Sequence, residues 1–581
     1  MILTIANWIY AALIAGIVGF GFIVFLKKVT GYACKEIDVC ILLGIALVTA
    51  YAEAFSLLYK VGGVANAVLV ALCILIGILC KKEIKNLLYI TYNKLISFKI
   101  KTFSKENIIR DLIVISVFIA FWLIACQRAY HADTDLYHAQ AIRWIEEYGV
   151  AKGLGNLHHR LAFNSAFMVL QALFSWKFLI DQSMHVMNAY LCMLLTMHAL
   201  FTCSWFKGKR VRGSDAFKVV MLLYDIMNVS VFASPNTDNF VLLFCLYILS
   251  KWCEYVEEKD KQPEAFGLLC ILALYAVTVK LSVAMIMVLT LKPAIELLKK
   301  KRYKSIFFMI VTGLFILLPF SFRNFMISGY FLYPSVATGF FEVDWKMLPD
   351  SVKFDKQEIM ARARGIYEVN RYSEACNMPF AEWFPIWWSQ QEFWIQLMFV
   401  INIILVLVLI GINCRKIIKR YENYDIVINI TVIVQFIYWM MTAPRNRYGI
   451  VFLFLIPCMV IVHLVETNKK IIIKFYSKFM PMAFGILAVS FIFKSGLNIE
   501  EIPLKRSSYY VYRECEEVEW EGMTMYTPIE NNYTGYYYFP SITYEDRLKY
   551  LELRGETLKE GFRIKDEYKH VKIMTDGRPM E

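Results

Sequence analysis

Residues 4–26, TIANWIYAALIAGIVGFGFIVFL, form an apolar run without a charged side chain, and Lys27 and Lys28 follow it directly. A helix needs about 20 apolar residues to cross roughly 30 Å of hydrocarbon, so this run predicts a membrane span. It lacks a basic leader and is too long for a signal-peptide core, so we expect it to be retained. Across the 581 residues, 58% are hydrophobic and the mean hydropathy is +0.49. The sequence therefore predicts a polytopic membrane protein.

Similar apolar runs predict about fourteen spans, so the expected fold class is an all-α transmembrane helix bundle. The runs lie at 4–26, 38–58, 63–80, 111–127, 183–206, 217–233, 238–253, 264–280, 282–297, 304–322, 391–413, 426–443, 448–466 and 478–494. A further run at 161–180 is apolar enough to span, but a span there would reverse the side of the basic residues that follow. We interpret it as an interfacial or re-entrant helix.

The basic residues lie in clusters between the runs, which favours a role in membrane topology over nucleic-acid binding. Segment 81–110 is strongly basic and is placed in the cytoplasm by the positive-inside rule. Counting the spans alternately puts the other basic clusters on the same side; they are Lys27–Lys28, Lys207 to Arg212, Lys299 to Arg302, Arg415 to Arg420 and Lys469–Lys470. No GxxxxGK[ST] loop and no GxGxxG motif is present, which disfavours an ATP-driven pump.

This topology predicts five parts. They are N-terminal spans with a basic linker (1–110), a membrane core (111–322) with a first outer loop (128–163), an extracytoplasmic loop (323–390), C-terminal spans (391–494) and an extracytoplasmic tail (495–581). Alternating aromatic and polar residues in the tail predict a small α+β or β segment. The polar outer regions are where we expect function. The short loops favour a bacterial plasma membrane, with the active site on the extracytoplasmic side.

The densest polar cluster is HADTDLYHAQAIRWIEEYG at 131–149, where the run at 111–127 ends. Asp133, Asp135, Tyr137 and His138 lie close together, and carboxylates and imidazoles so placed can move protons or bind a divalent cation. The apolar spacing that follows Asp135 predicts an amphipathic helix on the membrane surface. The alternative for Asp135 is a simple helix cap.

The stretch Asp133-Thr134-Asp135-Leu136-Tyr137 resembles the Asp-Glu-x-x-Tyr element in the first outer loop of C-type (GT-C fold) glycosyltransferases, with the second acid displaced by one residue. The resemblance extends in layout over residues 111 to 466. It implies transfer of a sugar from a polyprenyl-phosphate donor to a cell-envelope glycan or lipid acceptor. Asp133 would be the general base, with Asp135 as the second catalytic candidate. Low-dielectric surroundings would raise the pKa of Asp133 and make it a better base.

Tyr137 is the first candidate for binding the substrate, and further candidates lie later in the sequence. GLGNLHHRLAFNSAF (153–167) supplies His158, His159 and Arg160, where relatives often have His-Pro-Pro, and RNFMISGYFLYPS (323–335) resembles another element of these enzymes. In the latter, Arg323 could hold the lipid phosphate or anchor the helix end. The remaining cations are Lys280, Arg445 and Arg447. Each can bind phosphate or lipid head groups, or, for Lys280, snorkel to the interface.

A metal requirement is left open at this stage. A divalent cation, Mg²⁺ or Mn²⁺, would have Asp133, Asp135 and His138 as candidate ligands. Asp238, the first residue of the run at 238–253, is most simply a helix cap. Two other functions compete with the transferase: a surface-polysaccharide polymerase or ligase using arginines of 323–390, and a flippase or transporter of lipid-linked sugars. The flippase is disfavoured because repeats are not evident and the ionisable residues crowd the outer boundary.

Overall fold

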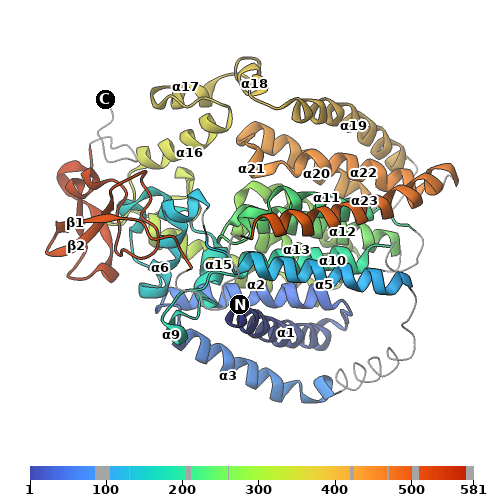
Figure 1. Cartoon of the computed structure of the whole chain (residues 1–581), viewed down its shortest axis with the longest axis horizontal. Helices are drawn as coiled ribbons and strands as arrows, with labels where there is room; N and C mark the ends of the chain where they lie inside the picture. The colour runs from blue at the N-terminus through green and yellow to red at the C-terminus, as the bar shows by residue number, and fades with distance from the viewer. Residues whose placement is uncertain are drawn as a thin grey trace.

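The computed structural model describes residues 1–85, 105–129, 131–204, 211–258, 261–418, 424–467, 470–499 and 509–570. Most of the basic linker 81–110, the basic residues at 207–210 and Lys469 lie outside these described residues. Within them the chain is mostly helical, with a small β segment in the tail, as the sequence predicts. Figure 1 shows the long helices running side by side, with the β segment at one end of the bundle.

Nine described helical segments are long and apolar enough to cross a membrane, so the count of fourteen spans is not confirmed. They are α1 (Ile2–Thr30), α2 (Ile37–Ser56), α12 (Thr237–Glu258), Leu281–Lys299, α15 (Tyr303–Ser328), α19 (Phe393–Ile418), α20 (Tyr424–Thr442), Asn446–Glu466 and α23 (Lys470–Leu497). Leu281–Lys299 comprises the 3₁₀ helix η5 (Leu281–Thr290) and α14 (Leu291–Lys299), and Asn446–Glu466 contains α21 (Asn446–Gly449) and α22 (Phe452–Glu466).

The other predicted spans overlap helices outside these nine segments. These are α3 (Gly63–Leu79), α5 (Lys105–Ala125), α10 (Met187–Thr202), α11 (Asp215–Met227) and α13 (Pro263–Val279). The disputed stretch 161–180 forms the end of a 3₁₀ turn, η2 (His159–Ala162), and two short helices, α8 (Ala166–Leu173) and α9 (Lys177–Ile180). Eight residues rise only about 12 Å in a helix, so α8 is too short to cross a bilayer.

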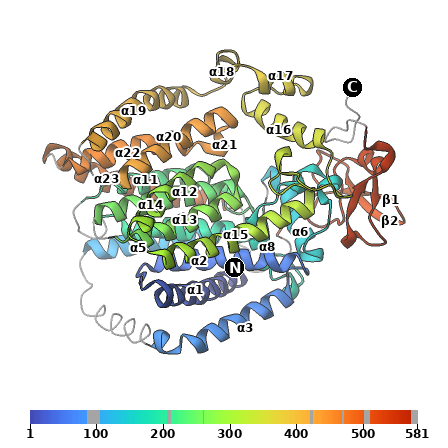
Figure 2. The same ribbon diagram turned by 180° about the vertical axis from the view of Figure 1, so that it is seen from behind.

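Small residues let the first two helices pack closely. A Cβ atom at Gly19 of α1 would collide with the carbonyl of Cys40 in α2, and one at Gly44 would collide with the carbonyl of Ala15. Close backbone approach through small residues is how helices associate in lipid, where apolar burial alone gives little driving force. By contrast, α12 is buried on nearly all sides, which places it at the centre of the bundle. Figures 1 and 2 show α3 and α19 at opposite edges.

The tail lies against one end of the bundle, which we call the tail end (Figure 2). It contains two antiparallel hairpins, β1 (Cys515–Trp520) with β2 (Met523–Pro528) and β3 (Leu551–Leu553) with β4 (Phe562–Ile564). The loop 323–390 contributes α16 (Pro349–Ala363), α17 (Tyr372–Asn377) and α18 (Phe380–Ser389). The segment after α5 (Lys105–Ala125) lies at this end, because the Ala129 N–H donates to the carbonyl of Tyr509 in the tail at 3.1 Å. The start of α12 lies there too, because the His131 N–H donates to Ser234 Oγ at 3.2 Å.

The amphipathic helix predicted after Asp135 is present as α6 (Ala139–Tyr148), but its predicted place on the membrane surface is wrong. The tail covers it instead. Arg143 Nη1 donates to the carbonyls of Tyr536 and Tyr537, both at 2.6 Å, and Gln140 Nε2 donates to the carbonyls of Gly535 and Tyr538. The polar face of α6 therefore donates hydrogen bonds to backbone carbonyls of the tail instead of to water.

A buried polar network continues this contact. Glu146 of α6 lies 3.1 Å from His185 and accepts a hydrogen bond of 2.6 Å from the Tyr536 hydroxyl. Ser183 donates to the same carboxylate, and Tyr510 of the tail contacts His185. Because each buried polar group would be costly without partners, the network holds the tail, α6 and the start of α10 in one arrangement.

We predict that Arg513→Ala loosens the tail from the bundle. The substitution leaves the Asp135 carboxylate, whose side chain is 1% exposed, without its guanidinium partner. Breaking a buried charge pair costs about 3 kcal/mol. We expect a lower thermal midpoint of the purified protein and faster proteolysis within 509–570. Lys569→Ala removes an exposed tail ion pair and should change neither. Equal behaviour of the two variants would contradict the docking role of Arg513.

Candidate functional site

Four ionisable side chains from distant segments meet at the tail end, and we call them the Asp133 cluster. Asp133 follows α5, Asp238 lies in the first turn of α12, Lys280 separates α13 from η5, and Arg447 lies in α21. Arg447 Nη2 is 2.7 Å from Asp133 Oδ2, and its Nε is 3.9 Å from Asp238 Oδ2. Lys280 Nζ forms an ion pair with Asp238 Oδ1. Two carboxylates and two cations thus form one connected network.

Tyr448 supports both cations of this cluster. Lys280 Nζ lies 4.5 Å from the centre of its ring, and the Arg447 guanidinium carbon lies 5.0 Å from it. Cations are attracted to the face of an aromatic ring. Arg447 remains 38% exposed at its side chain and Lys280 24%, whereas the two carboxylates are largely buried. The exposed part of the cluster is therefore its positive side.

Asp133 is held ionised, so the expectation of a raised pKa is wrong for this residue. Burial alone would raise the pKa of its carboxyl, but Arg447, His138 and His131 together hold that pKa well below its usual value. Burial also lowers the pKa of His138 to about 3 and lowers the pKa of His131. The lowering contributions together outweigh the cost of desolvation, and that of Arg447 is the largest of them.

Asp133 and Asp135 do not act as a pair. Asp135 accepts two hydrogen bonds at Oδ2 from Arg513 of the tail, at 3.0 and 2.5 Å, and burial raises the pKa of its carboxyl. Neither carboxylate caps a helix; both sit at the start of the π-helical turn η1 (Thr134–His138). Asp133 faces Arg447 and Asp135 faces the tail, which makes Asp135 a positioning residue in this arrangement.

The prediction that Asp238 caps α12 is also wrong. Asn236 Oδ1 accepts the hydrogen bonds from the backbone N–H groups of Asp238 and Asn239, at 2.7 and 3.4 Å. The carboxylate of Asp238 is thereby left for Lys280 and Arg447. The sequence alone does not indicate this role for Asp238, because a single acid at the start of an apolar run is the usual pattern of a helix cap.

The histidine pair occupies a second, adjacent group. His158 and His159 stack with ring centroids 5.1 Å apart, and His159 Nδ1 lies 2.8 Å from Asp355 of α16. Arg160 lies 3.9 Å from Glu358 of the same helix and is near enough to Asp133 to help lower its pKa. Arg160 therefore lies between the Asp133 cluster and the histidine group, and Asp355 and Glu358 are residues that sequence reasoning missed.

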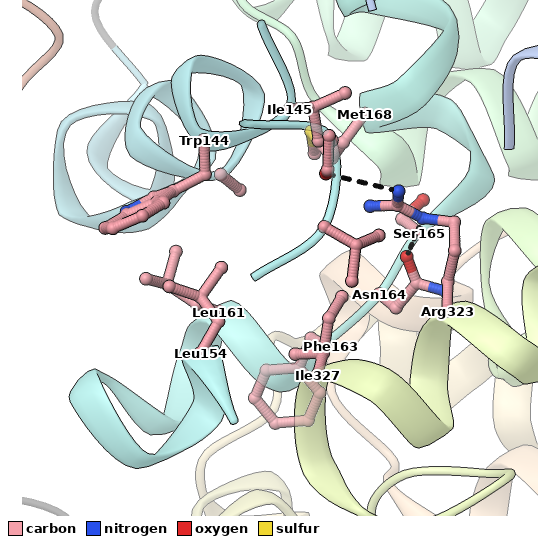
Figure 3. A pocket seen from close by; sticks show the side chains of 13 residues that line it. Trp144, Ile145, Leu154, Leu161, Phe163, Asn164, Ser165, Met168, Arg323 and Ile327 are labelled. Atoms are coloured by element: carbon pink, nitrogen blue, oxygen red, sulfur yellow. Dashed lines mark hydrogen bonds between the residues drawn. The ribbon is translucent and has the colours of Figure 1, made fainter. Parts of the chain in front are cut away.

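The other predicted residues lie outside the Asp133 cluster. Arg323 is buried in a small pocket, where it donates to Asn164 Oδ1 at 3.1 Å and to the Gly149 carbonyl (Figure 3). It also donates to the Ser56 hydroxyl. Three acceptors of the protein itself occupy its guanidinium, so the structure favours helix packing over phosphate binding for Arg323. Arg445 is exposed beside α21, and Tyr137 is half-buried next to His138, with ring centroids 4.3 Å apart.

The three predicted metal ligands do not come together. Among the residues that the structure describes, the group with metal-ligand spacing is His159, Asp355 and Glu358, not Asp133, Asp135 and His138. His138 is neutral and buried beside Asp133, but Asp135 is turned to Arg513.

Ionisable residues are not restricted to the tail end, which corrects the sequence-based expectation. At the opposite end, Lys218 Nζ lies 2.8 Å from Glu254, and His198 Nδ1 lies 2.9 Å from Asp38. Lys251 joins Asp38 and Glu254 in the same network. Asp38, His198, Lys251 and Glu254 border a cavity of about 640 Å³. One of the two arguments against a transporter is therefore weaker than the sequence suggests.

A family model described as a domain of unknown function (DUF8201) matches residues 1–454. The chain belongs to the DUF8201 family. The matched region contains the whole Asp133 cluster and the histidine group, whereas the tail, with Arg513, lies beyond it. No curated protein and no solved structure matches the chain.

We predict that Lys280→Met destabilises the protein by leaving the buried Asp238 carboxylate without its ammonium partner. An unsatisfied buried group costs about 1–3 kcal/mol, which should appear as a lower thermal midpoint. The double variant Asp238→Asn/Lys280→Met should recover part of the loss, because the unpaired charge is gone. Lys353→Met, which removes an exposed ion pair on α16, is the control. A double variant no more stable than Lys280→Met would rule out the coupling.

Proposed function

We propose that this protein is an integral membrane glycosyltransferase that moves a sugar from a polyprenyl-phosphate donor to a glycan or lipid acceptor of the cell envelope. In this proposal it lies in a bacterial plasma membrane and acts on the extracytoplasmic side. The observation that carries the proposal is the pairing of the ionised Asp133 carboxylate with Arg447, beside Lys280. A proton acceptor and phosphate-binding cations are the two requirements of such a transfer.

In the proposed reaction the acceptor hydroxyl oxygen attacks the anomeric carbon of the donor sugar. The bond between that carbon and the phosphate oxygen breaks, and the lipid phosphate leaves with the electron pair. The hydroxyl proton passes to Asp133. Arg447 and Lys280 bind the leaving phosphate, with Arg160 near enough to add positive charge. The guanidinium can meet a phosphate with two parallel hydrogen bonds.

The low pKa of Asp133 gives Arg447 a second role. While paired with Arg447, the carboxylate is a weak base, because a base works best with a pKa near the working pH. A donor phosphate that attracts Arg447 would weaken this pairing and raise the pKa of Asp133 within its buried surroundings. The base would then become effective only when donor is bound, which disfavours proton transfer in its absence.

We expect Asp133→Asn to reduce transfer at least about 100-fold, the usual contribution of a general base. Purified full-length protein would be given a panel of radiolabelled polyprenyl-phosphate sugars with envelope lipid and glycan acceptors. Asp350→Asn, an exposed carboxylate at the start of α16, is the matched control and should retain activity. Full activity of Asp133→Asn would rule out its role as base. Lipid translocation without transfer by the wild type would favour the flippase instead.

The pH profile offers a separate test of the pairing. Arg447→Ala removes the main attraction that lowers the pKa of Asp133, so the pKa should rise. Because the base is lost as the pH falls through its pKa, the acidic limb of kcat/KM should move to higher pH. Arg445→Ala removes a neighbouring exposed guanidinium and should leave the limb in place. A limb unmoved by Arg447→Ala would mean that Asp133 is not the titrating base.

A further inference from the structure

The buried Asp355 carboxylate of α16 has an oxygen that its surroundings do not explain. Its side chain is 1% exposed, and Tyr333 donates a hydrogen bond to Oδ2. Oδ1 has no hydrogen-bond donor among the described residues. Oδ1 lies 2.8 Å from His159 Nδ1, yet the ring is not oriented to donate a hydrogen bond to it. A buried carboxylate oxygen without a donor is one mark of a site where an ion binds.

A third ligand lies one helical turn further along α16. Glu358 follows Asp355 at a spacing of three residues, which places both carboxylates on one face of the helix. One ligand atom from each of His159, Asp355 and Glu358 lies within 4.8 Å of the others. Ligands bonded to one ion at about 2.1 Å lie at most about 4.2 Å apart, so a small side-chain rotation brings all three into range.

From this arrangement we propose that His159, Asp355 and Glu358 bind a divalent transition-metal ion. One imidazole with two carboxylates suits Zn²⁺ or Mn²⁺, whereas Mg²⁺ and Ca²⁺ take oxygen ligands. The Tyr333 hydroxyl orients the carboxylate of Asp355 from the second side, as outer hydrogen bonds do at metal sites. Glu358 Oε1 is 3.1 Å from Arg362, so Glu358 binds through its other oxygen.

The ion would be structural and would link two segments of the chain. His159 belongs to η2, which contacts η1 beside Asp133, and Asp355 and Glu358 belong to the loop 323–390. Binding would fix α16 against the segment that carries Arg160, at the side of the Asp133 cluster. This role is structural and does not depend on the proposed transferase activity. The competing explanation is a proton shared by His159 and Asp355, because burial raises the pKa of the Asp355 carboxyl.

The test measures metal binding by the full-length protein in detergent. After treatment with EDTA, the protein is dialysed against equal concentrations of Zn²⁺, Mn²⁺ and Mg²⁺, and bound metal is counted by mass spectrometry. We expect about one Zn²⁺ or Mn²⁺ ion for each wild-type chain, and at least a tenfold lower affinity in Glu358→Gln and Asp355→Asn. Because Asp355 is buried and its variant could fail to fold, the half-buried Glu358 is the main test.

Two matched control variants test whether the ion binds at this site. Asp350→Asn changes an exposed carboxylate of the same helix, and Asp133→Asn changes the first ligand suggested by the sequence; both should bind metal as the wild type does. Added metal should also raise the thermal midpoint of the wild type and of Asp350→Asn, but not of Glu358→Gln. Fewer than about 0.1 ions per wild-type chain, or equal binding by Glu358→Gln, would overturn the proposal. Loss of binding in Asp133→Asn alone would move the site to Asp133.

Discussion

The contact between Arg447 and Asp133, 2.7 Å long, joins α21 to the segment that follows α5 at the tail end. Isolated charges buried beside a membrane are costly, so Asp133 and Asp238 require cations that only distant segments provide. Arg447 supplies one cation from α21, and Lys280 supplies the other from the end of α13. The positions of four helix ends thus depend on one network. The same network makes the exposed side of the site positive, because the side chains of Arg447 and Lys280 are more exposed than the two carboxylates.

The membrane character was predictable because it follows from composition and from the length of apolar runs. The run at 4–26 falls within the long, apolar helix α1, and the run at 391–413 overlaps α19 over most of its length. The number of spans was less predictable, because a hydropathy profile does not distinguish a crossing helix from a short one buried by neighbours. The middle of the run at 161–180 forms α8, whose side chains are buried against other parts of the protein rather than exposed to lipid.

The site was predictable only in part. Asp133 and Arg447 stand out because charged residues at the ends of apolar runs are costly. Their pairing across 314 positions has no local signal. Asp238 shows the opposite error: its local pattern fits a cap, but Asn236 takes that role, and only the fold brings Lys280 to the free carboxylate. Asp355 lies in a polar helix whose pattern does not distinguish its buried side chain from exposed neighbours.

The tail shows how a segment outside the family match can shape a site within it. Arg513 holds Asp135, two positions from Asp133, while the backbone N–H of Gly535 donates to the Asp135 carbonyl at 2.9 Å. Both contacts fix the turn η1, which sets the direction of the Asp133 side chain. A free turn could let Asp133 move away from Arg447, and the burial that opposes its charge would then dominate its pKa. The tail therefore acts on Asp133 through the backbone, and its docking and the ionisation of Asp133 are linked.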